Sequence, residues 1–534
     1  CPAHVAVQGY LKLAAQGRYD EALALIKREN PLPAICGRVC NRRCEDACTR
    51  GRVDAAVAID EVKKFIAQRD LDAATRYVPP VVTPTRAGGF DQKIAIIGAG
   101  PAGLSCAFYL AEKGYKPVVF EKNERPGGML TYGIPSFKLQ KDVIEAEVEV
   151  IRLMGAEFRY GVEVGRDVTL DELRAQGFKA FYVAIGCQGG RLAGIPGEDA
   201  EDVTVAVDFL REVNSGKIDA LPGRTIVVGG GNVAIDVARN ACRLGSDHVE
   251  MFCLESEAQM PASEEERREA VEDGAHISCG WGPKEVHLDE AGRVCGITFK
   301  RCTRVFDDEG RFAPEYDEND LRRVDADRVV MSIGQSIVWG DLLAGSKVEL
   351  GRGQGALADP QTYQTAEPDI FVGGDVYTGP SFAIDAIAAG HEAAVSIHRF
   401  VQPGSTLTIG RNQRRYTALD RDDVVIESYD NASREVAHVD REREKAAPFS
   451  EYVETFTEEQ VRAETARCLG CGASIVDPNK CIGCGLCTTK CAFDAIHLDR
   501  DRPECSTMVK YEQKLPSLGK YALKRAIKIK FGRK

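Results

Sequence analysis

The sequence predicts an α/β fold, preceded by a small helical domain and followed by a small α+β domain. Three observations lead to this prediction. A strand–glycine turn–helix–strand unit occurs at 93–122 and again from 224 to 255. Strand–turn–helix segments return at 327–335 and 368–391, after the second unit. Closely spaced cysteines gather near both ends of the chain. At 534 residues the chain is long enough for several domains and a sizeable core.

Composition narrows the function classes. The formal net charge of −12 argues against a nucleic-acid partner, because a phosphate backbone is met by basic surface. No apolar run is long enough to predict a membrane span. Nineteen cysteines, many in close-spaced clusters, suit thiolate ligands in a reducing compartment better than a disulfide framework, which indicates the cytoplasm. The first residue is Cys1 rather than Met, so we expect the native start to lie upstream and leave a targeting signal open.

Residues 1–75 are predicted to be helical, because apolar residues recur there at helical spacing. A cysteine recurs at every fourth position, at Cys36, Cys40, Cys44 and Cys48. On a regular helix this spacing would place all four side chains on one face. A buried cysteine stripe is the alternative, but polar residues crowd the positions between them. Cys1 precedes Pro2, a pair that often closes an iron–sulfur ligand run. We therefore predict a [4Fe-4S] site on this domain.

Residues 76–92 are rich in proline and glycine and are predicted to be a linker. The first nucleotide unit follows, with a GxGxxG turn at Gly98, Gly100 and Gly103. These glycines allow, in order, a tight turn, backbone approach to a pyrophosphate and close packing of helix on strand. Glu121, 21 residues past Gly100, is placed to hold a ribose diol. A glycine-rich structural turn is the alternative, but it leaves the rest of the unit unexplained. Further cofactor contacts are predicted at Pro101, Ala102 and Lys122.

Three more glycines, at 127, 128 and 133, imply a backbone that passes close to something flat and bulky. A helix at 142–154 and a strand at 178–186 complete the first part of this nucleotide domain, at 93–190. From the glycine stretch we predict four cofactor-binding residues: Gly128, Met129, Leu130 and Lys138.

A second nucleotide domain is predicted at 191–326. It repeats the strand, the glycine turn and the helix, and its second strand runs into Glu255, 24 residues after Gly231. An acid at this strand end favours a free ribose 2′-hydroxyl and repels a 2′-phosphate, so NAD is favoured over NADP. A merely solvated strand end is the alternative. The predicted contacts in the turn are Gly229, Gly230, Gly231, Asn232 and Val233.

Residues 327–404 are interpreted as the last part of the first nucleotide domain, resumed after the second was inserted. Gly334 ends one strand of this part, and Gly374 and Asp375 follow another. Asp375 is placed to bond a ribityl hydroxyl, and the helix that starts near Phe382 points its N-terminus at the pyrophosphate, which adds Ser381 and Ala383 to the predicted contacts. The prediction is thus of two Rossmann-like domains, with the second inserted in the first.

Residues 405–455 are charged and aperiodic and are predicted to be an extended linker. The predicted domain at 456–534 contains the pair Cys468 and Cys471 in a CxxC motif. Four further cysteines, Cys481, Cys484, Cys487 and Cys491, have the spacing of a bacterial ferredoxin. Zinc would need only four thiolates, usually as separated CxxC pairs. We predict one [4Fe-4S] cluster here and a second in which Cys491 pairs with Cys468 and Cys471. The basic tail at 510–534 is either a docking segment for an acidic partner or a solvated helix.

Residues 1–405 resemble the flavin-containing small (beta) subunit of glutamate synthase and its relatives. These relatives include the N-terminal half of dihydropyrimidine dehydrogenase and the large subunit of the electron-bifurcating, NADH-dependent reduced ferredoxin:NADP oxidoreductases. The resemblance implies FAD at the first nucleotide unit, NAD(P)H at the second, hydride transfer to the flavin and [4Fe-4S] clusters on the N-terminal domain. The motifs that carry it are NPLPAICGRVC, IIGAGPAGLSCA, RPGGMLTYGIPSFKL, VVGGGNVAIDVAR, EAQMPAS and FVGGDVYTGPSFAIDAIAAG.

Three departures from the family pattern matter. By resemblance, Cys1, Cys40 and Cys44 would hold one cluster, and Cys48 would belong to another whose other ligands are absent from this sequence. The family supplies a Glu or Gln ligand to the first of these clusters, but the matching position looks like Lys63, and an ammonium group cannot bind iron. The fourth ligand of that cluster is therefore left open, with Asp60 and Glu61 nearby in the sequence. NADP-using relatives carry two arginines where this sequence has a leucine followed by Glu255, which agrees with NADH.

The function expected from these features is that of an NADH:acceptor oxidoreductase subunit. Hydride passes to FAD, and single electrons leave through [4Fe-4S] clusters to a partner subunit or to ferredoxin, within a complex that is a candidate for electron bifurcation. The cofactors carry out the chemistry themselves, so no catalytic acid, base or nucleophile is expected from the protein. Three alternatives stay open: the glutamate synthase small subunit, a thioredoxin-reductase-like enzyme, which would need a redox CxxC near the flavin, and a docking subunit without turnover.

Overall fold

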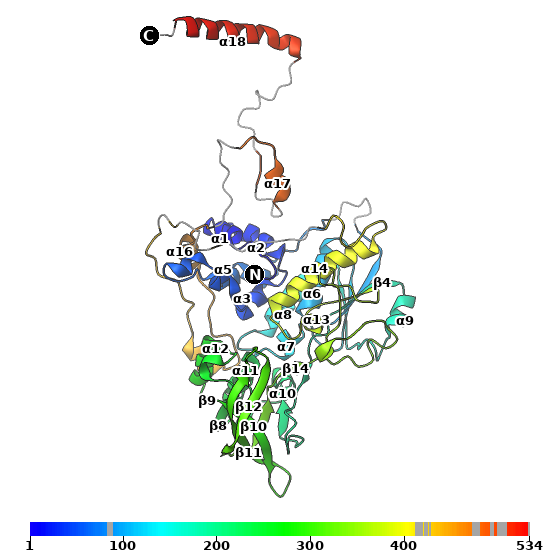
Figure 1. Cartoon of the computed structure of the whole chain (residues 1–534), viewed down its shortest axis with the longest axis vertical. Helices are drawn as coiled ribbons and strands as arrows, with labels where there is room; N and C mark the ends of the chain where they lie inside the picture. Colours follow the sequence, from blue (N-terminus) through cyan, green and yellow to red (C-terminus); the bar gives the residue numbers. More distant parts are fainter. Residues whose placement is uncertain are drawn as a thin grey trace. The chain divides into compact units, whose positions relative to one another are not determined.

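The computed structural model describes residues 1–82, 89–411, 420, 426, 429–471, 481–491, 496–498 and 510–531. The chain divides into two compact units, Cys1–Gly472 and Ala473–Lys534 (Figure 1). The first unit contains two five-stranded parallel sheets with helices packed on them, and a helical N-terminal part. The predicted α/β class is confirmed.

The first parallel sheet has the strand order β15-β4-β1-β2-β3. Its strands are β1 (Lys93–Ile97), β2 (Val118–Glu121), β3 (Glu157–Tyr160), β4 (Phe178–Val183) and β15 (Ile370–Val372). Strand β15 comes late in the chain, yet it pairs in parallel with β4, with Phe371 opposite Tyr182. The second nucleotide domain is therefore inserted in the first, as the sequence predicted.

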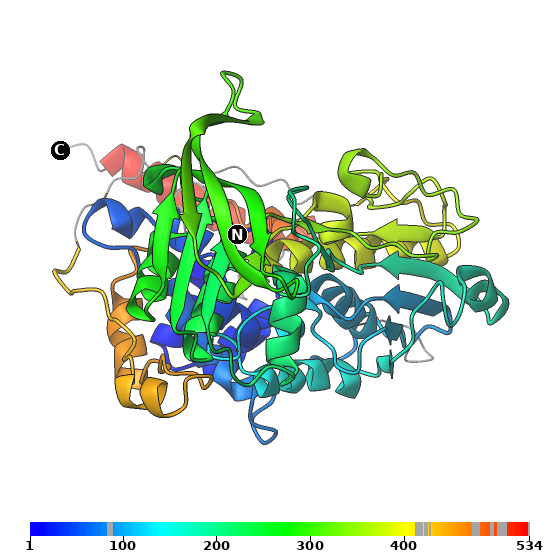
Figure 2. The same ribbon diagram turned by 90° about the horizontal axis from the view of Figure 1, so that it is seen from below.

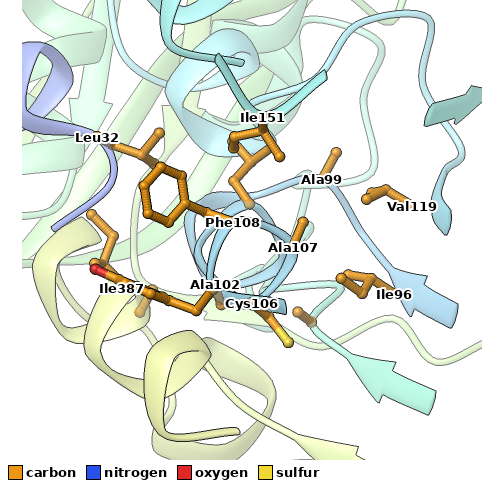
Figure 3. Close-up of a cluster of buried hydrophobic side chains, with 14 of the residues drawn as sticks. Leu32, Ile96, Ala99, Ala102, Cys106, Ala107, Phe108, Val119, Ile151 and Ile387 are labelled. Atoms are coloured by element: carbon orange, nitrogen blue, oxygen red, sulfur yellow. The ribbon is translucent and has the colours of Figure 1, made fainter. Parts of the chain in front are cut away.

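Helices pack against the first sheet and bury its apolar strands, as expected for parallel strands. They are α6 (Pro101–Glu112), α7 (Met129–Tyr132), α8 (Lys141–Leu153), α9 (Leu170–Ala175), α13 (Asp375–Thr378) and α14 (Ala383–Val401), with the 3₁₀ turn η4 (Arg352–Gln354). Figure 3 shows the core around α6, where Phe108 and Cys106 point outward from the helix among side chains of neighbouring elements. Helices α6 and α14 are in close contact, because Ser105 donates a hydrogen bond of 2.7 Å to the Ile387 carbonyl oxygen.

The second parallel sheet has the order β6-β13-β7-β8-β9. Its strands are β6 (Val203–Val205), β7 (Arg224–Val228), β8 (His248–Cys253), β9 (His276–Cys279) and β13 (Arg328–Met331), and its helices are α10 (Ala206–Asn214), α11 (Asn232–Arg243) and α12 (Glu264–Glu272), with η3 (Glu257–Gln259). An antiparallel sheet of β10 (Trp281–Leu288), β11 (Val294–Phe306) and β12 (Phe312–Val324) packs beside it (Figure 2). Stacked rings of Phe252 and Phe299, 3.9 Å apart, join the two sheets. The short strands β5 (Gly189–Gly190) and β14 (Gln335–Ser336) pair where the chain enters and leaves this domain.

The N-terminal part is helical, as predicted. Its helices are α1 (Val7–Ala15), α2 (Tyr19–Lys27), α3 (Pro33–Val39), α4 (Arg43–Asp46) and α5 (Ile59–Ala67), with the 3₁₀ turns η1 (Thr49–Arg52) and η2 (Gln68–Asp70). The four cysteines at intervals of four do not lie on one regular helix. Helix α3 ends at Val39, and Arg42 adopts a left-handed φ of 54°. Cys36 therefore lies in α3, Cys40 follows its end, Cys44 lies in α4 and Cys48 directly precedes η1.

The segment 429–471 returns to the N-terminal helices. It contains α15 (Arg441–Ala446) and α16 (Glu458–Ala466), and Phe456 and Val461 are buried in the same apolar cluster as Tyr10 and Leu23. Part of the predicted linker at 405–455 lies outside the described residues, and its described end carries α15. Contacts made by α16 thus join residues 456–471, predicted with the ferredoxin-like domain, to the first unit.

The second unit contains α17 (Leu486–Lys490) and α18 (Tyr511–Phe531) in its described part. Every residue of α18 is exposed, including apolar side chains such as Leu518 and Ile527. None of the helices in the described part of the chain combines the length and apolar character that crossing a membrane requires.

Gly390 tests the contact between α6 and α14. A Cβ at this position would lie 2.2 Å from the Ala102 carbonyl oxygen, so Gly390→Ala should push the helices apart and lower the free energy of unfolding by about 1–3 kcal/mol. Gly519→Ala is the matched control in α18, where a Cβ meets no atom within 4 Å. Chemical denaturation measures both. Equal stability of Gly390→Ala and the unchanged chain would contradict the packing described here.

Candidate functional site

A cavity lies at the carboxyl ends of the strands of the first sheet, where open α/β sheets bind ligands. Residues at the carboxyl ends of three strands line it: Ile97 at the end of β1, Glu121 at the end of β2 and Gly373 after β15. Val233 and Asp236, from α11 of the inserted domain, line the same cavity. The first and second nucleotide units therefore meet in one space.

Two glycines of the first glycine turn have different roles: Gly103 allows close packing inside the protein, whereas Gly100 faces the cavity. Gly98 has a φ of 103°, and a Cβ on Gly103 would lie 1.9 Å from the Gly98 carbonyl oxygen. Gly103 therefore lets α6 pack on the strand, as predicted. A Cβ on Gly100 would meet no protein atom within 4 Å, yet Gly100 lines the cavity. The open space at Gly100 fits a group outside the protein, such as a pyrophosphate.

The carboxylate of Glu121 is buried and fixed by three hydrogen bonds. Oε2 accepts from the Ala99 N–H at 2.8 Å, and Oε1 accepts from the backbone and side-chain nitrogens of Asn123 at 2.9 and 2.7 Å. Glu121 thus ties the glycine turn to the end of β2 while it lines the cavity. A ribose diol would meet a carboxylate that is already oriented.

Asp375 also lines the cavity, at the start of α13. It follows Gly374, whose φ is 66°, and burial raises the pKa of Asp375 to about 6 although the Ser381 N–H lowers it. Phe382, the residue before α14, makes no side-chain cap to that helix. The helix α14 therefore presents N–H groups next to the cavity, which suits a phosphate.

The second glycine turn has the same construction. A Cβ on Gly229 would lie 2.3 Å from the Ser332 carbonyl oxygen, whereas a Cβ on Gly231 would meet no protein atom. Helix α11 begins directly after Gly231 and has no side-chain cap. An Oε2 atom of Glu255 lies 2.9 Å from the place of a Cβ on Gly230, so the carboxylate sits beside the turn.

The structure sorts the predicted cofactor residues into two groups. The first group lines the cavity: Gly98, Gly100, Pro101, Ala102, Glu121, Lys122, Gly128, Met129, Leu130, Val233, Gly374, Asp375, Ser381, Phe382 and Ala383. The second group does not belong to its lining: Gly103, Lys138, Gly229, Gly230, Gly231, Asn232, Glu255 and Gly334.

Lys138 has a structural role that the sequence did not indicate. Its Nζ forms ion pairs with Asp236 at 2.6 Å and with Glu266, both in the inserted domain. Asp236 was missed as a site residue, although it stands three positions after Val233 and therefore on the same helix face. That spacing was the signal that sequence reasoning left unused.

The ammonium group of Lys63 is buried in the N-terminal domain, where Asp60 and nearby cysteines act on its charge. Burial alone lowers its pKa, but Asp60, Cys40 and Cys36 hold the pKa of Lys63 well above its ordinary value. Burial raises the pKa of Cys44 to about 12, and Lys63 opposes this rise. Lys63 forms an ion pair with Asp60, so it occupies the predicted ligand position as a cation. Cys1 is exposed at the start of the chain.

The donors at these cysteines are thiols, the ligand type that iron–sulfur clusters use. The cysteines that the structure describes form no disulfides. Among the described residues, no group of three or more His, Cys, Asp and Glu side chains is arranged to hold a metal ion.

The ferredoxin run lies in the second unit. Cys481, Cys484 and Cys487 are exposed, and Gly483 and Gly485 between them have φ values of 67° and 75°. These left-handed turns bend the backbone so that closely spaced thiolates can face one cluster. Cys505 lies outside the described residues.

Three family models match three different parts of the chain. A family model described as pyridine nucleotide-disulphide oxidoreductase matches residues 92–390. Models for dihydropyrimidine dehydrogenase domain II, 4Fe-4S cluster, and for a 4Fe-4S binding domain match residues 1–75 and 474–497.

Among similar proteins, the beta subunit of the NADP(+)-dependent formate dehydrogenase of Moorella thermoacetica is 35% identical over 88% of this chain and 69% of its own. The glutamate synthase [NADPH] small chain of Escherichia coli K12 is 35% identical over 75% of this chain and 88% of its own. The structure of FprA from Mycobacterium tuberculosis in complex with NADPH has a TM-score of 0.50 at 20% identity, over 58% of this chain and 84% of FprA, which shows a shared fold.

Gly100→Ala separates binding from folding. Because the added Cβ meets no protein atom, the free energy of unfolding of the flavin-free chain should stay within about 0.5 kcal/mol. The affinity for FAD should fall about tenfold or more, a loss of about 1.4 kcal/mol, because the methyl group enters the space assigned to the pyrophosphate. Gly103→Ala, which clashes inside the protein, should instead lower stability. Unchanged FAD binding by Gly100→Ala would contradict the cradle.

Lys63→Gln tests whether a cluster lies beside this ammonium group. Removal of a positive charge disfavours the more negative, reduced cluster, so the reduction potential of the N-terminal cluster should fall by an amount on the order of tens of millivolts. An EPR-monitored redox titration measures the shift. Lys64→Gln is the control on the same helix, because Lys64 pairs with Glu451. Equal potentials in the Lys63→Gln variant and the unchanged chain would place the cluster elsewhere.

Proposed function

The chain belongs to the pyridine nucleotide-disulphide oxidoreductase family, among the FAD- and iron–sulfur-containing subunits related to the glutamate synthase small chain, and from that membership we propose that it oxidises NADH and passes single electrons to a partner subunit or ferredoxin. Family membership assigns it oxidoreductase chemistry with a flavin, NAD(P) and [4Fe-4S] clusters near both ends of the chain. The direction of electron flow, NADH as donor and the acceptor are parts of the proposal.

The observation that carries the proposal is the shared cavity. Residues of the first glycine turn and of α11, which follows the second glycine turn, line one space. A dinucleotide whose pyrophosphate binds at the N-terminus of α11 would reach this space with its other end. Bound FAD supplies the chemistry that takes up a hydride and gives up electrons one at a time.

The residues of the chain position and enclose these groups. Glu121, fixed by Ala99 and Asn123, would bind a ribose, while Asp375 and the N-terminus of α14 would offer further polar contacts in the cavity. The cavity wall also contains apolar side chains such as Phe120 and Trp339, which would exclude water from a flavin. No proton transfer by a side chain is required.

NADH is proposed as the donor because of Glu255. Its carboxylate lies beside the backbone of Gly230, at the turn where the adenosine ribose of a dinucleotide binds. A 2′-phosphate at this place would face a negative charge. The names of the two relatives above specify NADP(H), so this chain would differ from them in its donor.

The exit of electrons is proposed to involve another protein. The two relatives above are by name a subunit and a chain of larger enzymes, which supports a role as a redox subunit of a hetero-oligomeric complex. The exposed cysteines of the second unit support a cluster that an acceptor can approach. Electron bifurcation would need, in addition, a second flavin potential or a partner that supplies it.

Flavin reduction by the two nucleotides tests this proposal. Under anaerobic conditions NADH should bleach the flavin absorbance faster than NADPH does. Glu255→Gln should lower the NADH to NADPH rate ratio about tenfold, equivalent to about 1.4 kcal/mol, because it removes the repulsion of a 2′-phosphate. Glu257→Gln is the control, since Glu257 is exposed and lies two residues farther on.

Two outcomes would contradict the proposal. The absence of bleaching by either nucleotide would indicate a docking subunit without turnover. Faster reduction by NADPH than by NADH in the unchanged chain would refute the assigned donor.

A further inference from the structure

The end of the segment 429–471 is held on the N-terminal domain by a buried arginine. Only 1% of the surface of Arg467 is exposed. Its Nη2 donates to Asp54 at 3.0 Å and to the Ala55 carbonyl oxygen at 2.7 Å, and its Nε donates to the Ala432 carbonyl oxygen at 3.0 Å. A charge buried this deeply persists only where its partners are fixed, so the position of the next residue, Cys468, is fixed as well.

Glu464 strengthens this attachment. It pairs with Arg467 at 2.6 Å, and its two carboxylate oxygens accept from the Ala58 N–H at 2.7 Å and the Glu435 N–H at 2.8 Å. The side chain is fully buried. The end of helix α16 is thus joined to the loop between η1 and α5 through the buried charges of Glu464 and Arg467.

The same contacts bring Cys48 to Cys468. Arg50, two residues after Cys48, donates to the carbonyl oxygen of Arg467 at 3.2 Å, and Asp54 accepts from both arginines. Cys48 and Cys468 pack against one apolar cluster. Cys471 lies three residues after Cys468 in the same attached segment.

The loop after Cys468 lies over helix α1. The Nε2 of Gln8 donates to the carbonyl oxygen of Cys471 at 3.1 Å.

We propose that Cys48, Cys468 and Cys471 supply three thiolate ligands of one iron–sulfur cluster, so that the segment following the nucleotide domains completes a cluster site of the N-terminal domain. This replaces the expectation that Cys468 and Cys471 share a cluster with Cys491. It also gives Cys48 ligand partners within this sequence. Cys44 packs against the same apolar cluster as Cys48 and Cys468, whereas Cys36 and Cys40 pack with the cluster around α6.

Metal analysis of the full chain, purified without oxygen, tests the assignment without any use of NADH. Cys48→Ser, Cys468→Ser and Cys471→Ser should each lose the same cluster, about four irons per chain. The double variant Cys48→Ser/Cys468→Ser should lose no more iron than either single variant. Where a serine oxygen keeps the cluster, the same EPR signal should shift in all three single variants.

Cys242→Ser is the matched control, because Cys242 is a half-buried cysteine of α11 outside the N-terminal domain. It should retain all iron, and FAD content and circular dichroism show whether each variant is folded. Additive iron loss in the double variant would overturn the proposal. The proposal would also be overturned if Cys468→Ser and Cys491→Ser lost or shifted the same EPR signal while Cys48→Ser kept that signal unchanged. The presence of zinc in place of iron would overturn it as well.

Discussion

The close approach of α6 to two other stretches of backbone is the constraint on which the rest of the molecule depends. Gly103 leaves room for the Gly98 carbonyl oxygen, and Gly390 leaves room for that of Ala102. These contacts fix the first turn of α6 against the β1 turn on one side and α14 on the other. The N-termini of α6 and α14 consequently flank one cavity, and β15, although distant in sequence, closes the sheet beneath it.

The inserted domain contributes residues to this same cavity. Strands β5 and β14 pair where the chain crosses between the domains, and the ion pair of Lys138 with Asp236 joins α11 to the first nucleotide domain. Asp236 and Val233, together with Leu210 of α10, therefore line a cavity whose other lining residues belong to the first domain. This shared space is what the proposed hydride transfer requires, because the reacting ends of two bound dinucleotides would have to meet.

Local sequence patterns predicted the parts of the molecule that local rules determine. The two glycine turns, Glu121 at the end of β2 and the return of β15 to the first sheet followed from residue types at short spacings. The break in the cysteine-containing helix did not, because a left-handed Arg42 is rare in a non-glycine residue and carries no sequence signal. The attachment of Arg467 to Asp54 spans 413 residues, and only the folded chain brings the two together.

The central claim is that the two nucleotide cradles hold a nicotinamide against a flavin in one defined orientation. Rapid-mixing measurements with NADH carrying deuterium at one or the other C4 position test it most directly. We expect flavin bleaching to slow with one labelled stereoisomer and to keep its normal rate with the other, since hydride leaves from a single face. Equal rates with both labelled forms and unlabelled NADH would contradict the claim, if transfer itself limits the rate at saturating NADH.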